Sequence, residues 1–263
     1  MPITLIKSFV KSLFNRLGYE VTIRKKTMCP KKHKVNKPIK IEFIGPPGVG
    51  KTTIYEELIR RRKKKDVWLP VSFLSKQIKS IKLKESEVPE YHMALLEMKL
   101  NNVQGKKYSV FTKLSFLSYF FDVIKKDLIL SKDFNDLTTV SDEGIVHNFS
   151  KEILELSKQN SRLALCVLKN TAIIYCYASA KTITNNVLKR HRETGRLLAQ
   201  HRDKEKKDLM AVNKTAIENK EKTLQFLQTN NIPHVTLNTE EPVSINAQKV
   251  STFINKLHSS HSQ

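Results

Sequence analysis

Apolar positions along the chain follow two patterns, short continuous runs and stripes with helical spacing. Short segments rich in apolar and β-branched residues lie at 39–44, 137–140, 172–177 and 235–237. Segments of this length and composition are typical of strands, and the run at 172–177, which has no charged residue, is typical of a strand buried in a parallel sheet. Between the runs, apolar side chains recur every three or four residues, which predicts amphipathic helices. This order of strands and helices predicts an α/β fold with a mostly parallel sheet.

The segments between these strands differ in character. Residues 109–130 are rich in aromatic side chains interleaved with Leu and Val, so we interpret them as a core helix and not as a base-stacking platform. Residues 67–74 form a weaker strand candidate because Pro70 interrupts them. Residues 76–88 have the composition of a charged connector. Further helices are expected from Thr52, over 89–101 and 149–156, from 181, in a long polar segment to 228, and over 245–257.

The first strand runs into a loop whose glycines and lysine have a defined spacing. Gly45, Gly50, Lys51 and Thr52 match G-x-x-x-x-G-K-[ST]. Glycines in such a loop let several backbone N–H groups point at one phosphate, and the helix N-terminus that follows favours an anion. The lysine adds a positive charge at the β/γ-phosphates, and the threonine hydroxyl can bind Mg²⁺. We therefore predict an ATP-binding loop made of Gly45, Pro46, Pro47, Gly48, Val49, Gly50, Lys51, Thr52 and Thr53.

A second site is predicted where the strand at 137–140 ends in Ser141, Asp142 and Glu143. The carboxyl ends of parallel strands meet at one edge of a sheet, so an acid here emerges beside the phosphate loop, where Mg²⁺ sits. We predict that Asp142 joins Thr52 at the metal, and that Asp142 or Glu143 orients or deprotonates an acceptor hydroxyl. The alternative is that the two acids only close a turn after the strand.

Positive charge is in large excess, with 47 Lys+Arg against 25 Asp+Glu in 263 residues and a net charge of +22. Such an excess indicates polyanionic neighbours. Arg190, Arg192 and Arg196 lie in a segment with few acids, which leaves their guanidinium groups available to bind phosphate. Residues 3–17 have the pattern of an amphipathic helix, and residues 3–40 as a whole are basic. This segment can lie on an anionic membrane, or it can pack on the domain with its lysines solvated; nucleic acid is a less favoured partner.

The cysteines and the apolar runs bear on the cellular compartment. Cys29, Cys166 and Cys176 show no paired spacing, so we expect no disulfide framework and a reducing environment. No apolar run reaches the ~18 residues that a transmembrane helix needs, and the N-terminus lacks the pattern of a signal peptide. We expect a cytoplasmic protein whose N-terminal segment can meet the inner face of the membrane.

The phosphate loop near the start, the acidic strand end, the next strand and helix, and the Arg-rich segment occur in an order that resembles the P-loop kinase family. The resemblance covers roughly residues 38–258 and is greatest to nucleoside and nucleotide kinases such as thymidylate kinase. It implies a three-layer P-loop NTPase sandwich with helical inserts and an Arg-rich lid at about 189–206. The chain would then divide into a basic amphipathic extension, 1–37, and a kinase-like domain, 38–263. The residues that the resemblance assigns to catalysis are Lys51, Asp142, Glu143, Arg190, Arg192 and Arg196.

The chain also departs from this family. Asp142 is followed by Glu143, where such kinases carry an acid–Arg pair, and no segment between 66 and 100 matches a known acceptor motif. These departures leave the acceptor open. Residues 13–21 resemble the N-termini of bacterial surface-polysaccharide enzymes, which implies an envelope or sugar-linked acceptor.

These features predict an ATP- and Mg²⁺-dependent phosphotransferase that moves the γ-phosphate to a small hydroxyl or phosphate acceptor. The alternative is a nucleotide-switched ATPase that docks to membrane or nucleic acid through basic surfaces. A GTPase is disfavoured because Asn213 and Lys214 are not followed by the Asp of an Asn-Lys-x-Asp motif. An ABC ATPase is disfavoured because no Ser-Gly-Gly signature is present.

Overall fold

The computed structural model describes residues 40–81, 88–195 and 205–259, and these residues belong to two compact units. One unit is entirely helical in its described part, and we call it the helical unit. The other contains every described strand, and we call it the sheet unit. The helical unit includes Ser72–Asn135 and Glu152–Val167, and the sheet unit consists of Lys34–Val71, Asp136–Lys151 and Leu168–Gln263, as far as each is described.

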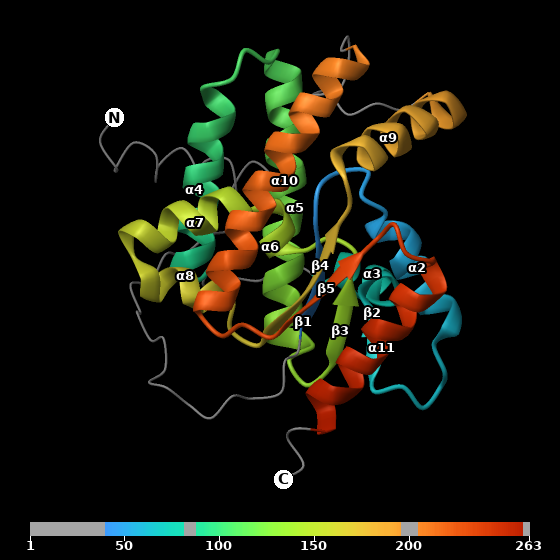
Figure 1. Cartoon of the computed structure of the whole chain (residues 1–263). Coiled ribbons are helices and arrows are strands. Elements are labelled where there is room, and N and C mark those ends of the chain that lie inside the picture. The colour runs from blue at the N-terminus through green and yellow to red at the C-terminus, as the bar shows by residue number, and fades with distance from the viewer. Residues whose placement is uncertain (1–39, 82–87, 196–204, 260–263) are drawn as a thin grey trace. The chain divides into compact units, whose positions relative to one another are not determined.

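The sheet unit is built on one five-stranded sheet with the order β2-β3-β1-β4-β5 (Figure 1). All four strand pairings are parallel, which confirms the predicted α/β fold. The central strand β1 has β3 on one side and β4 on the other, so the chain switches direction across it, as at the ligand-binding edge of open α/β sheets. The strands are β1 (Lys40–Ile44), β2 (Trp68–Pro70), β3 (Thr138–Ser141), β4 (Thr171–Tyr177) and β5 (His234–Asn238).

Helices cover the sheet on both faces, which explains why its strands are continuous apolar runs. In Figure 1, α2 and α11 lie side by side on one side of the sheet, and α10 runs along the other side. Ile41 and Phe43 of β1 and Leu58 of α2 are fully buried in the shared core. The helices of this unit are α2 (Lys51–Arg61), α6 (Ile145–Asn148), α9 (Ala180–Thr194), α10 (Lys206–Thr229) and α11 (Val243–Ser259).

The helical unit is organised around a pair of packed helices, α4 and α5. Met93, Leu96 and Leu100 of α4 contact Phe121 of α5 in a small buried cluster. A buried pair, His92 Nε2 and Asp127 Oδ2 at 2.8 Å, also joins the two helices. The helices of this unit are α3 (Ser75–Ser80), α4 (Glu90–Gln104), α5 (Val110–Asp133) and α8 (Ser161–Val167), together with α7 (Ser150–Gln159), which begins in the sheet unit.

Two expectations about these elements are wrong, and a third is confirmed in part. The first part of α5 does not lie in the core, because Phe111 is 79% exposed. The contact between α5 and α4 is centred further along, on Phe121. The connector expected at 76–88 contains part of the short helix α3. The weak strand candidate at 67–74 is confirmed as far as Pro70, where β2 ends. The chain continues as the 3-10 turn Val71–Leu74, since proline cannot donate a hydrogen bond to a neighbouring strand.

The cysteines also differ from expectation. Cys166 is disulfide-bonded, so the expectation that the cysteines form no disulfide is wrong. Cys176 is free and fully buried in β4, and burial raises the pKa of its thiol to about 12. The cysteine set therefore no longer supports a reducing compartment.

Several expectations fall outside the described residues. The amphipathic extension 1–37, Arg196 and half of the expected lid lie there, and the division of the chain at residue 38 stays a prediction. Within the residues that the structure describes, no helix combines the length and the apolar character needed to cross a membrane.

Candidate functional site

The loop between β1 and α2 lies against two other elements so closely that only glycine fits at two of its positions. A Cβ atom on Gly45 would overlap the backbone carbonyl of Cys176 in β4. A Cβ atom on Gly48, which has φ +82°, would lie 2.6 Å from Cγ2 of Val187 in α9. Asn186 of α9 donates a hydrogen bond to the carbonyl of Gly48 at 3.1 Å. The glycines therefore let β4 and α9 hold the loop in one shape.

The helix that follows this loop begins without a side-chain cap. Gly50 occupies the N-cap position, and the first turn of α2 contains no acid. Backbone N–H groups in the first turn of a helix have no partner within the helix, and the helix dipole favours an anion near them. The side chains of Thr52 and Thr53 are exposed on this turn, whereas Val49 is buried in the core. The start of α2 is therefore suited to a phosphate group.

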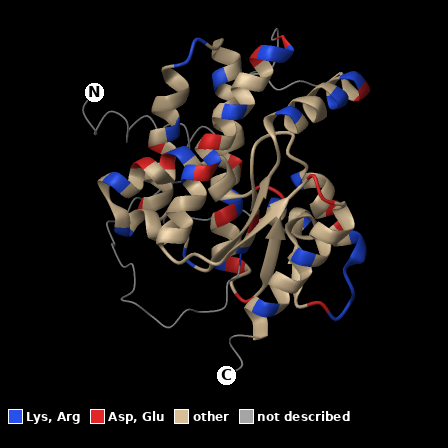
Figure 2. Ribbon diagram, viewed as in Figure 1, with Lys and Arg blue, Asp and Glu red and all other residues tan. Residues whose placement is uncertain are grey.

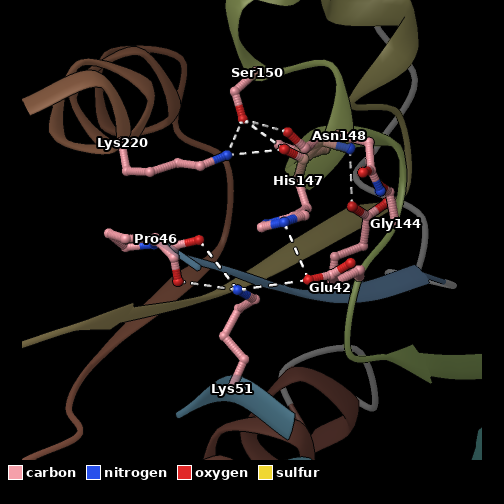
Figure 3. Close-up of polar contacts among 11 residues, drawn as sticks. Glu42, Pro46, Lys51, Gly144, His147, Asn148, Ser150 and Lys220 are labelled. Atoms are coloured by element: carbon pink, nitrogen blue, oxygen red, sulfur yellow. Dashed lines mark hydrogen bonds and ion pairs between the residues drawn. The ribbon is translucent and has the colours of Figure 1, made fainter. Parts of the chain in front are cut away.

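Lys51 is the first residue of α2, and its ammonium group folds back over the loop. Nζ donates to the carbonyl of Pro46 at 3.2 Å (Figure 3). It also donates to the carbonyl of Gly45 at 3.2 Å and lies 3.7 Å from Oε1 of Glu143. Burial lowers the pKa of Lys51, and the charges of Glu143 and Asp142 oppose that shift. A positive charge is thus held between the phosphate loop and the acids that follow β3.

Glu143 is held from two directions. Its Oε1 lies 3.3 Å from Nε2 of His147, one helical turn further along the chain, and the charge of Lys51 lies on the other side. Partial burial raises the pKa of Glu143, but the hydrogen bond with His147 and the charges of His147, Lys51 and Lys220 outweigh it and bring the pKa to about 2. Glu143 is therefore a carboxylate at neutral pH.

His147 is neutral at the same pH. Burial lowers its pKa to about 4; the charges of Lys220 and Lys51 add to this shift, and the hydrogen bond with Glu143 opposes it. A neutral ring that pairs with a carboxylate carries its proton on Nε2, so His147 donates to Glu143. The other ring nitrogen, Nδ1, is buried and has no hydrogen-bond partner. His147 was not singled out from the sequence, although its spacing of four from Glu143 was visible.

Asp142 occupies the position immediately after β3 and is partly buried. It contributes to the electrostatic environment of Lys51. Among the described residues, no cluster of three or more His, Cys, Asp or Glu side chains could hold a metal. Thr52 and Asp142 offer a hydroxyl and a carboxylate, the hard oxygen donors that Mg²⁺ takes alongside water and phosphate oxygens. The donor chemistry of these two residues therefore fits Mg²⁺, with most ligands coming from a nucleotide and solvent.

Sequence reasoning missed a buried acid, Glu42, that supports this site. Glu42 of β1 accepts hydrogen bonds from the backbone N–H groups of Ile145, at 3.2 Å, and Val146, at 2.9 Å. It thereby caps the N-terminus of α6, the short helix that carries His147. Gly144 lies against the Glu42 carboxylate, where a Cβ atom would overlap it. One acid inside a buried apolar run was the available signal.

Lys220 of α10 is the second residue that the sequence did not reveal. Its Nζ donates to the carbonyl of His147 at 2.8 Å and to Oγ of Ser150 at 2.6 Å. Figure 3 shows the ammonium groups of Lys220 and Lys51 on either side of the His147 ring. Lys220 lies in a long polar helix with many lysines, so nothing in its spacing distinguishes it.

The predicted lid arginines are only partly described. Arg190 and Arg192 are exposed near the end of α9. Asn186 is the residue of α9 that contacts the phosphate loop. Arg190 lies one turn further along α9, on the same face of the helix. Arg192 projects from another face. The structure thus brings together Lys51, Asp142 and Glu143 but joins neither described arginine to them.

The start of α9 is fixed by a loop that follows β5. Glu240 accepts hydrogen bonds from the hydroxyls of Ser179, at 2.7 Å, and Thr182, at 2.6 Å. Thr239, the residue before it, lies beside Gly50. The loop after β5 thus contacts both the beginning of α9 and the phosphate loop, which defines how these two segments sit within the sheet unit.

Comparisons with known proteins find similarity among solved structures only. No family model and no curated protein matches this chain. A solved structure of deoxyadenosine kinase from M. mycoides with bound dATP is similar over 82% of this chain and 99% of that chain, with 16% identity and a TM-score of 0.42. At this level of similarity no residue role transfers. The resemblance of residues 13–21 to surface-polysaccharide enzymes gains no support from these comparisons.

Proposed function

We propose that this protein is an ATP-dependent phosphotransferase that moves the γ-phosphate of ATP to a small hydroxyl or phosphate acceptor. The observation that carries the proposal is the position of the Lys51 ammonium, on the carbonyls of Gly45 and Pro46 and 3.7 Å from Glu143. A phosphate-binding charge and an ionised carboxylate are thus adjacent at the start of an uncapped helix. Phosphoryl transfer requires this combination of positioning and charge.

Binding would begin at the phosphate loop. Free N–H groups at the start of α2 bind the β- and γ-phosphate oxygens, and Lys51 turns from the loop carbonyls to the phosphates. Its partly desolvated ammonium interacts more strongly with an anion than a solvated one would. Thr52 and Asp142 would hold Mg²⁺, which would neutralise charge on the phosphates.

Glu143 is our candidate for orienting the acceptor. As a carboxylate it accepts a hydrogen bond from the acceptor hydroxyl, and His147 keeps it in place. The acceptor oxygen forms a bond to the γ-phosphorus as the bond to the β–γ bridging oxygen breaks, and the hydroxyl proton passes to Glu143 or to solvent. A carboxylate with a pKa of about 2 is a weak base, so its contribution is mainly to positioning.

The arginines at the end of α9 would complete the site. Asn186 ties α9 to the phosphate loop, and Arg190 continues the same helix face. A guanidinium group that reaches the transferred phosphoryl group stabilises the charge that spreads over its oxygens. We assign this role first to Arg190, with Arg192 and Arg196 as further members of the predicted lid.

Acceptor-dependent ADP release tests this function. Purified protein is incubated with ATP and Mg²⁺, alone and with separate pools of nucleosides, nucleotides and sugars. The proposal expects ADP release to rise sharply with one pool, and that pool identifies the acceptor class. Slow release that no pool changes would contradict the phosphotransferase and favour an ATPase. The Lys51→Ala protein measures the background that does not come from this site.

A further inference from the structure

Large apolar side chains gather at one end of the α4–α5 pair in the helical unit. Tyr108 is 38% exposed, Val110 75%, Phe111 79% and Leu114 53%. All four lie in the loop after α4 or in the first turns of α5. We call residues 105–114 the hairpin tip. Exposed apolar side chains that gather in one short segment mark an interaction site more often than scattered ones do.

The same segment is positively charged. Lys106 and Lys107 are exposed in the loop, and Lys113 follows in α5. No acid occurs between Glu97 and Asp122. Figure 2 shows the loop that joins α4 and α5 in blue, with no red on it. The hairpin tip therefore combines apolar and cationic side chains without any anionic one.

Local contacts hold the hairpin tip in a defined shape. Oγ of Ser109 accepts a hydrogen bond from the backbone N–H of Thr112 at 3.2 Å and so caps α5. Nζ of Lys113 donates to the carbonyl of Gln104 at 2.9 Å, which closes the loop. The Tyr108 and Phe116 rings are in contact, with centroids 5.4 Å apart. The loop is thus built to present Val110 and Phe111 outward.

We propose that the hairpin tip docks on an anionic lipid bilayer, with Val110, Phe111 and Leu114 entering the headgroup–acyl boundary. Apolar side chains gain free energy on leaving water for this boundary, and nearby lysines extend their ammonium groups toward lipid phosphates. Tyr108 has the amphipathic ring that suits the interface. The docking surface lies in the helical unit and does not depend on the phosphotransferase function.

Charge decides against two other occupants. A symmetric pairing of two hairpin tips from two copies of this chain would bring Lys106 and Lys107 against the same lysines of the partner, which is repulsive. The basic segment 1–40 has Glu20 as its only acid, so it is equally unfavourable. Nucleic acid would satisfy the lysines but would leave Val110 and Leu114 without the apolar surroundings that they gain in a bilayer.

A tryptophan reporter tests the docking directly. The chain has one tryptophan, Trp68, which is buried, so the Phe111→Trp variant adds an exposed indole at the hairpin tip. The full-length variant is mixed with vesicles of phosphatidylcholine alone, or of equal parts phosphatidylcholine and phosphatidylserine, with brominated acyl chains. We expect a blue shift and quenching of the new indole with the anionic vesicles. The control is Ile245→Trp, at a position 45% exposed in α11 near Glu240 and Glu241, which we expect to remain unquenched.

Two further variants separate the lipid contacts. In the Phe111→Trp protein, Val110→Ser combined with Leu114→Ser should abolish the blue shift of the indole. The melting temperature should be unchanged, since both side chains are exposed. Lys106→Gln with Lys107→Gln should weaken partitioning about thirty-fold, because each lysine near an anionic surface is worth about 1 kcal/mol.

The proposal is overturned if the chain binds anionic vesicles but the indole at position 111 is not quenched, because binding would then use another surface. Equal quenching by phosphatidylcholine vesicles would overturn the role of charge. A spectral shift that grows with protein concentration in the absence of lipid would indicate a second copy as the occupant. A shift that appears only with added RNA or DNA would indicate nucleic acid.

Discussion

Oε1 of Glu143 lies 3.3 Å from Nε2 of His147, a residue one turn further along the chain. The pair connects the end of β3 to α6, and Glu42 of β1 caps that helix. The carboxylate beside Lys51 is therefore positioned by its own segment and also by the central strand of the sheet. This relationship distinguishes Glu143 from Asp142, which precedes it.

Replacing Glu143 by Gln should abolish most turnover without unfolding the protein. The amide keeps the shape but removes the negative charge that faces Lys51 and the acceptor. We expect the rate of ADP release with acceptor to fall roughly a hundredfold, the order of loss found when reacting groups are no longer held in position. Asp142→Asn should instead raise the Mg²⁺ concentration needed for half-maximal rate. If Glu143→Gln instead raised the Mg²⁺ requirement and Asp142→Asn abolished turnover, Asp142 would orient the acceptor and Glu143 would bind the metal.

The stability of the protein should fall as the pH drops from about 6.5 to about 4, because His147 is buried in its neutral form. Its folded-state pKa is below the unfolded value, so the unfolded chain binds an extra proton in this window. Stability is therefore full above the window and is lost through it, with a slope of up to about 1.4 kcal/mol per pH unit. Urea unfolding at several pH values measures this slope.

The matched variant for this measurement is His147→Gln. Glutamine can donate a hydrogen bond to Glu143 but does not titrate, so the slope between pH 6.5 and 4 should shrink. Glu143 also has a lowered pKa, of about 2, and its contribution is lost only at lower pH, below about 4.5. An identical slope in wild type and His147→Gln would show that other groups cause the pH dependence.

Gly144→Ala should destabilise the protein by about 1–3 kcal/mol, the usual cost of adding an atom to a packed site. The new Cβ atom would overlap the Glu42 carboxylate and so displace the cap of α6. Gly105→Ala is the control, since its Cβ atom would approach only the carbonyl of Asn101, at 3.6 Å. Thermal unfolding of both variants measures the difference, and equal melting temperatures would contradict the tight contact.

Arg190→Ala should lower turnover by about a hundredfold, as loss of a group that stabilises developing charge does. ATP binding, measured by calorimetry, should change less than turnover. Lys189→Ala removes a neighbouring cation that pairs with Glu193 at 3.9 Å, and it should leave turnover close to wild type. Arg192 projects from another face of α9, so Arg192→Ala should lower turnover less than Arg190→Ala does. Similar turnover rates for Arg190→Ala and Lys189→Ala would contradict the role of Arg190 in phosphoryl transfer.

The sequence was sufficient to predict the parallel sheet, because β1, β3 and β4 are buried along almost their whole length and are rich in apolar and β-branched residues. The phosphate loop could also be predicted from the sequence. The close approach of β4 and α9 requires glycine at Gly45 and Gly48, and these glycines are apparent in the sequence. The proximity of Lys51 to the acids after β3 followed from strand order alone. These features depend on local pattern or on general topology.

Other features depended on contacts that no local pattern records. Lys220 reaches His147 from a helix more than seventy residues away in sequence. Phe111 belongs to an aromatic segment that is typical of a core, but α4 packs on α5 further along the helix, where Phe121 and Asp127 lie. The exposure of the hairpin tip therefore could not be foreseen from composition or periodicity.

Transfer of a labelled phosphate tests the central claim most directly. ATP labelled at the γ-phosphate is incubated with Mg²⁺, wild-type protein and the acceptor pool that raises ADP release, and the label is recovered from acceptor and from free phosphate. Lys51→Ala is measured in parallel after its fold has been checked by circular dichroism. We expect label in the acceptor with wild type and almost none with Lys51→Ala. Label that stays in free phosphate with wild type, or transfer that persists in a folded Lys51→Ala protein, would contradict the phosphotransferase.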